Sequence, residues 1–220
     1  MIAFRGTTDD DLAMTGHTTT RRAPTPEPTS KLLTYEDWLD FPHDDGNRHE
    51  LIGGVHVVSP MPVIGHQRAS RSILVALANY LRANPLGEVF PDGTGVKLSD
   101  HDAVIPDLTY VAHERAEIVG DQVLEGGPDL VVEVLSPSSR RRDEGVKLGL
   151  YERYGAREVW LVDWEEKAVA VHRRRASGLD PAARLTAAAG DVLATPLLPG
   201  FELPLAELFS HPRPPGRPSS

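Results

Sequence analysis

The run from Pro128 to Ser138, PDLVVEVLSPS, is the feature that most constrains how this chain can fold. It is apolar and is bounded by turn residues, with Gly126-Gly127 before it and Ser136-Pro137-Ser138 at its end. Such a run predicts a strand that is covered on both faces. Glu133 stands in its middle, where burial should be greatest. An unpaired buried carboxylate is costly or takes up a proton, so we expect a metal ion, a lysine or an arginine beside it.

Composition narrows the class of protein. The 220 residues suffice for one domain with tails, and the absence of cysteine excludes disulfides and thiolate metal sites. No run approaches the ~18 apolar residues of a membrane span, and no apolar signal-peptide core is present, so we expect a cytoplasmic protein. The net charge of -9 argues against an overall basic surface but leaves room for a local basic groove.

The two ends of the chain differ from its middle. Residues 1–30 contain few large apolar side chains, and residues 210–220 are rich in proline, so both segments are predicted to be disordered. The domain is then expected to span residues 31–209.

Local patterns in that domain predict both helices and strands. Thr34 is a good N-cap for a short helix, Gly53-Gly54 predicts a hairpin, and apolar spacing over 64–82 predicts a helix with His66 in its first turn. A second helix is expected from about 142 to 154, with Val146 bordering the core, followed by a hairpin of 158–163 with 168–172. The predicted class is α/β or α+β, with one mixed central β-sheet flanked by helices.

Four ionisable residues fall on or beside these elements: Glu50, Asp107, Glu133 and Lys147. Paired strands lie about 4.8 Å apart, so carboxylates on neighbouring strands can converge on one cation. Carboxylates with several waters suit Mg²⁺. Asp143, Lys147 and Tyr151 follow at i, i+4 and i+8 and should share one helix face. A lysine beside a metal can stabilise a phosphorane or orient an attacking water.

Each of these residues also has a purely structural interpretation. Glu133 could form an ion pair with an arginine, and Asp107 could be a turn former. Lys147 could be a solvated helix residue paired with Asp143, and Glu50 could be an exposed strand residue. His66 could be an ordinary helix residue, and the arginines at 140–142 could be a solvated face unless they contact phosphates.

Several motifs together resemble one known family. They are Glu50-Leu51-Ile52-Gly53-Gly54, His66, Pro106-Asp107-Leu108, the run 128–138, then Asp143, Lys147 and Tyr151, and finally residues 158–163. In this combination the chain resembles the Uma2 family of the PD-(D/E)xK restriction-nuclease-like superfamily. The resemblance implies a restriction-endonuclease-like core with a mixed sheet, Mg²⁺ held by Asp107 and Glu133, and Glu50 as a helper acid. Where the superfamily pattern has a lysine two residues after the acid, this chain has Leu135, and we assign the lysine's role to Lys147.

The resulting hypothesis is a Mg²⁺-dependent endonuclease, with Mn²⁺ as a substitute, that cuts DNA and acts as a homodimer. Catalysis is assigned to Asp107, Glu133, Lys147 and Glu50. Substrate binding is assigned to His66, Arg140, Arg141 and Tyr151. Two alternatives stay open: a non-catalytic interaction or nucleic-acid-binding module with this fold, and a metal-free carboxylate-pair hydrolase of sugars.

Overall fold

The computed structural model describes residues 31–42, 45–137 and 139–210. The predicted arm at 1–30 lies outside this range, as does the predicted tail from 211 onward. The folded unit begins at Leu32. No helix among these residues combines the length and apolar character needed to cross a membrane.

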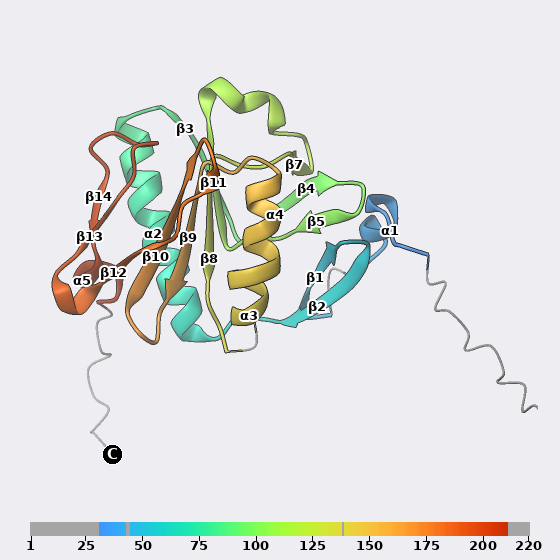
Figure 1. Cartoon of the computed structure of the whole chain (residues 1–220), viewed down its shortest axis with the longest axis horizontal. Helices are drawn as coiled ribbons and strands as arrows, with labels where there is room; N and C mark the ends of the chain where they lie inside the picture. The colour runs from blue at the N-terminus through green and yellow to red at the C-terminus, as the bar shows by residue number, and fades with distance from the viewer. Residues whose placement is uncertain (1–30, 43–44, 138, 211–220) are drawn as a thin grey trace, which may run out of the picture. The chain divides into compact units, whose positions relative to one another are not determined.

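A seven-stranded mixed sheet forms the centre of the unit (Figure 1). In spatial order its strands are β11 (Gly178–Leu179), β10 (Ala168–Arg175), β9 (Glu158–Asp163), β8 (Leu130–Val134), β6 (Leu108–Ala112) and β3 (Gly87–Pro91), with β12 (Ala183–Thr186) also paired to β10. Strand β8 runs parallel to β9 and antiparallel to β6. All five of its residues are buried, so the predicted strand covered on both faces is confirmed.

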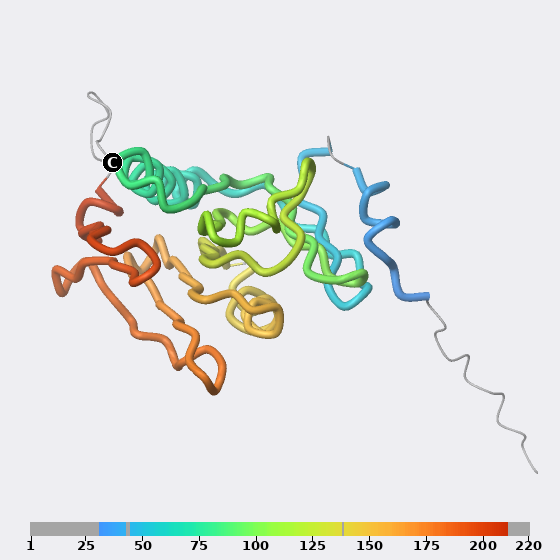
Figure 2. Tube along the Cα trace, turned by 90° about the horizontal axis from the view of Figure 1, so that it is seen from above, coloured from blue at the N-terminus to red at the C-terminus, as the bar shows by residue number. Residues whose placement is uncertain are grey.

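Helices cover the two faces of this sheet. Helix α2 (Ile64–Ala83) lies on one side and α4 (Leu148–Arg153) on the other, as Figures 1 and 2 show. Leu130, Val132 and Val134 of β8 share a core cluster with α2, whereas Val131 and Leu135 share one with α4. Because side chains alternate along a strand, Glu133 belongs to the α4 face.

A second, five-stranded sheet stands beside the first. Its order is β2 (Val55–Pro60), β1 (Asn47–Ile52), β5 (Asp102–Val104), β4 (Gly95–Ser99) and β7 (Val123–Glu125), and β13 (Val192–Ala194) pairs with β14 (Glu202–Pro204) in a separate ribbon. The predicted class, with a mixed central sheet flanked by helices, is confirmed, but the expectation of only one sheet is wrong in the described part of the chain. Pro106 lies where the chain leaves β5 for β6, and a proline cannot donate a hydrogen bond to a sheet ladder.

The remaining helices are short. They are α1 (Tyr35–Leu39), α5 (Leu205–Leu208) and the 3₁₀ turns η1 (His113–Ile118) and η3 (Ala187–Ala189). Helix α1 begins as predicted at Thr34, which forms a capping box with Asp37.

The helix predicted for residues 142–154 begins earlier and contains a wide turn. It consists of α3 (Arg140–Arg142), a π-helical turn η2 (Asp143–Lys147) and then α4. The Leu148 N–H bonds to the Asp143 carbonyl, five residues back, which is the pattern of a π-bulge. This turn directs Asp143 and Lys147 inward, whereas Val146 is 54% exposed. The prediction that Val146 borders the core is therefore wrong, because the wide turn rotates it outward.

Candidate active site

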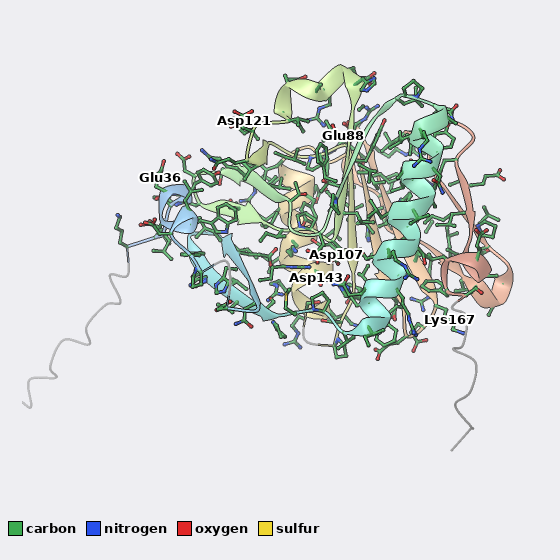
Figure 3. All side chains as sticks on the ribbon, turned by 180° about the vertical axis from the view of Figure 1, so that it is seen from behind. Glu36, Glu88, Asp107, Asp121, Asp143 and Lys167 are labelled. Carbon is green, nitrogen blue, oxygen red and sulfur yellow. The ribbon has the colours of Figure 1, made fainter. Side chains whose placement is uncertain are left out.

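A pocket of about 210 Å³ lies between the hairpin β1–β2, the start of α2, the end of β8 and the η2 turn. Glu50, His66, Asp107, Glu133 and Lys147 all line it. Residues predicted from distant parts of the sequence therefore meet in one place. Figure 3 labels Asp107 and Asp143, which lie near one another in that view and both line this pocket.

Strand pairing places Asp107 next to Glu133. Leu108 of β6 pairs with Val132 of β8, and in an antiparallel ladder the next pair along is Asp107 with Glu133. The Val134 N–H also donates to Asp107 Oδ2 at 2.6 Å, which holds the carboxylate against the end of β8. The two predicted metal acids are thus side by side at one edge of the pocket.

Asp107 is held as an anion by three donors. Besides the Val134 N–H, Arg48 Nη2 donates to Oδ1 at 2.9 Å, and His66 Nε2 lies 3.1 Å from Oδ2. Burial alone would raise the pKa of Asp107, but the His66 bond and the Arg48 charge outweigh burial and lower it to about 2. The carboxylate is therefore ionised throughout the neutral pH range.

Glu133 differs from Asp107 in that its pKa is raised rather than lowered. Its Oε1 lies 2.7 Å from Lys147 Nζ and accepts a hydrogen bond from the Tyr151 hydroxyl, while no donor in the described part of the chain reaches Oε2. Burial, reinforced by the nearby carboxylates Asp143, Asp107 and Glu50, raises the pKa of Glu133 to about 8 against the pull of Lys147. The raised pKa favours the protonated form of Glu133 when no cation is bound.

Lys147 joins two acids that are far apart in the sequence. Its Nζ donates to Glu50 Oε1 at 2.9 Å as well as contacting Glu133, and its side chain is 1% exposed. Burial would lower the pKa of Lys147, but Glu133 and Glu50 outweigh burial and raise it, so the ammonium stays charged. The partner of Glu133 is thus this lysine, and no ion pair joins Glu133 to an arginine within the described residues.

Glu50 is fixed from a second direction. The Ile105 N–H donates to Glu50 Oε1 at 2.9 Å. Burial would raise the pKa of Glu50, but Lys147 and this N–H outweigh it and lower the pKa. Glu50 and Lys147 therefore form a buried ion pair whose ammonium also contacts Glu133.

The four predicted substrate-binding residues occupy different positions. His66 lines the pocket, and its Nδ1 is buried without a partner among the described residues. Tyr151 is fully buried, bonds to Glu133 and is not part of the pocket lining, so it orients the acid from behind. Arg140 bonds to Asp163 at 2.7 Å and Arg141 is exposed, and neither lines the pocket.

Three lining residues were missed as site residues. Arg48 bridges Asp92 and Asp107, Arg142 donates to Ser59 Oγ at 2.7 Å, and Asp143 is 3% exposed. Burial raises the pKa of Asp143. Arg48 could have been found, because it lies two residues before Glu50 on the same strand and so shares its face. Asp143 was already expected on the helix face of Lys147, but no role in the site was assigned to it.

Comparisons with known proteins agree with this architecture. A model of the Uma2 family, described as "Putative restriction endonuclease", matches residues 34–206. The fold is similar to the crystal structure of a "putative nuclease belonging to DUF820" from Anabaena variabilis, with a TM-score of 0.68 and 19% identity, covering 80% of this chain and 97% of that one. At this identity the likeness shows the fold alone. No curated protein matches the chain.

Proposed function

The chain belongs to the Uma2 family, and we propose that it is a Mg²⁺-dependent endonuclease that hydrolyses phosphodiester bonds of DNA. The observation that carries this proposal is that Asp107 accepts a hydrogen bond from the N–H of Val134, the residue after Glu133, while the Lys147 ammonium lies 2.7 Å from Glu133. The superfamily pattern calls for two acids and a lysine in one site. Here the lysine comes from the helix that follows the strand.

The donor set fits a hard cation with few protein ligands. No group of three or more His, Asp or Glu side chains within the described ranges is arranged to hold a metal ion. Mg²⁺ does not need one, since it keeps several waters and is often bound through one or two carboxylates with substrate phosphates. Glu133 Oε2 accepts no hydrogen bond from the residues described. Four carboxylates line the pocket, and the raised pKa of Glu133 reflects this excess of negative charge.

We assign the residues of the site to two roles, which are holding the cation and stabilising the charge of the transition state. Asp107 and Glu133 would hold the cation, which when bound lowers the pKa of a water and neutralises phosphate charge. Lys147 would stabilise charge that develops on the phosphoryl oxygens as water adds to phosphorus and the P–O bond to the leaving group breaks. Glu50 keeps Lys147 in position, and Tyr151 orients Glu133.

Binding of DNA involves residues around the pocket. His66 and Arg142 line it and are suited to contact the scissile phosphate. Arg140 and Arg141, outside the pocket, would contact neighbouring phosphates of the strand. We further infer a homodimer, because two sites related by a two-fold axis can cut both strands at one place.

Plasmid nicking tests the proposed function. We expect the protein to convert supercoiled DNA to nicked and linear forms with Mg²⁺ or Mn²⁺ and to lose this activity in EDTA. The reason is that Asp107 and Glu133 supply too few ligands to retain Mg²⁺ against a chelator. Cleavage that persists undiminished in EDTA would rule the mechanism out.

Metal binding should strengthen as pH rises. Glu133, with its pKa raised to about 8, must lose a proton before it can bind a cation, so affinity should increase between about pH 6 and 9. Calorimetry of Mn²⁺ binding in buffers of different ionisation enthalpy would measure the released proton. An affinity that is constant across this range, with no proton release, would remove Glu133 from the ligand set.

A further inference from the structure

Beside the pocket lies an exposed apolar segment, Pro60–Ile64, with the sequence PMPVI. It joins the end of β2 to the start of α2, and we call it the apolar rim. Met61 is 62% exposed, Val63 57% and Ile64 71%. Side chains of this size gain free energy when they leave water, so three of them exposed beside a pocket form a candidate contact surface.

The apolar rim is part of the pocket wall. Pro60, Met61, Pro62 and Val63 line the same cavity as Asp107, Glu133 and Lys147. The cavity of about 210 Å³ is smaller than the ~300–1,000 Å³ of pockets that enclose a whole small-molecule ligand, so it suits a phosphate group rather than a nucleotide. The bases on either side of a bound phosphate must therefore lie outside the cavity, and on this side the surface they meet is the rim.

The cations Arg48 and Lys147 of the pocket wall are paired with acids and offer little attraction for the DNA backbone, whether single- or double-stranded. Proteins that bind duplex DNA derive much of their affinity from neutralising several phosphates. Here Arg48 is bonded to Asp92 and Asp107, Lys147 to Glu50 and Glu133, and the whole chain has a net charge of -9. Contacts to base faces, which are apolar and become available when bases unstack, suit the exposed rim better.

Met, Ile and Pro are among the side chains that proteins insert between base steps, and unstacking costs least where bases are already unpaired. We propose that the apolar rim holds unstacked bases next to the scissile phosphate, so that the preferred substrate is DNA whose bases are unpaired at the cleavage position. This inference rests on the proposed nuclease function and specifies its substrate class.

The test compares single-stranded and duplex oligonucleotides of the same sequence. Binding of labelled DNA to the full chain is measured by anisotropy in EDTA, and cleavage is measured separately with Mg²⁺. We expect wild type to bind the single strand at least tenfold more tightly than the duplex. The double variant Met61→Ser/Ile64→Ser should lose most of that preference. Val55→Ser is the matched control, since Val55 is 58% exposed at the other end of β2 and should leave the preference unchanged.

A 2-aminopurine base beside the cleavage position gives a second readout. Its fluorescence should rise on binding to wild type, because the base unstacks, and should rise less with the double variant. Equal affinity for both DNA forms, or an unchanged preference in the double variant, would overturn the inference. A double variant that changes its oligomeric state but keeps its DNA preference would also overturn the inference, because the rim would then contact a second copy of the chain. Preferential binding without any cleavage would instead remove the nuclease function and leave the base contact standing.

Discussion

Glu133→Gln is expected to abolish DNA cleavage while the chain remains folded. Glutamine keeps the shape of the side chain and can still accept the Tyr151 hydrogen bond, but it cannot become an anion. A neutral amide is a poor ligand for Mg²⁺, so the site should lose its cation. The Lys147 ammonium keeps Glu50 as a partner at 2.9 Å and is not left as an unpaired buried charge.

The same variant should be more stable than wild type at high pH when no metal is present. The folded-state pKa of Glu133, about 8, lies above its unpaired value of 4.5. The folded protein therefore holds this proton more tightly than the unfolded chain does. This favourable contribution is fully present below about pH 4.5 and is lost as pH rises through 8. The gain in unfolding free energy of Glu133→Gln over wild type should grow between about pH 4.5 and pH 8, to the order of a few kcal/mol.

Thermal unfolding in EDTA at several pH values measures this gain, with a nicking assay on the same samples. Glu88→Gln serves as a control, since Glu88 is exposed on β3 and labelled in Figure 3 away from Asp107. A Glu133→Gln variant that fails to fold would mean that the Glu133 charge is a structural requirement. Retained cleavage would mean that it is not a ligand.

Substitution of Lys147 is expected to affect both activity and stability. Lys147→Met keeps most of the side-chain volume but leaves Glu50 and Glu133 without their shared ammonium. Removing one partner of a buried ion pair commonly costs about 3–5 kcal/mol, and both acids should respond by taking up protons more readily. Loss of a charge contact to the transition state should also lower the cleavage rate by ~10²–10³.

Three measurements separate these two effects for Lys147. Cleavage rates are taken at a temperature where circular dichroism shows the variant to be folded, and metal binding is followed by calorimetry. Lys147→Arg should restore stability better than rate, because the planar guanidinium can pair with the acids without matching the position of the ammonium. Lys167→Met, at an exposed lysine between β9 and β10, is the control. A folded Lys147→Met variant that cuts at the wild-type rate would leave the lysine role unassigned.

Local sequence patterns were sufficient to predict most elements of this fold. An apolar run between turn residues predicted β8 and the burial of Glu133, because a strand without polar alternation has no face to turn to water. The Gly53-Gly54 pair predicted the β1–β2 hairpin, since both residues adopt positive φ there. Spacing at i, i+4 and i+8 predicted that Asp143, Lys147 and Tyr151 share one buried face.

Local patterns were less informative where backbone geometry departs from the regular period. A π-bulge changes which residues face inward, so Val146 was placed on the wrong side of its helix. The separation of β5 from β6 at Pro106 divides what looked like a single sheet into two.

The sequence by itself determined where the main strands and helices lie and that Glu133 is buried in a strand, because the periodicity and composition of each segment favour one type of element. Only the tertiary structure decided which of their residues meet. The Glu50–Lys147 ion pair joins positions 97 residues apart, and Arg48 reaches Asp107 from a strand of the other sheet. Contacts of this kind depend on strand order and register, and a shift of one residue would turn Glu133 to the opposite face. The paired acids, their lysine and the arginine that holds Asp107 therefore become a site only when the two sheets are assembled.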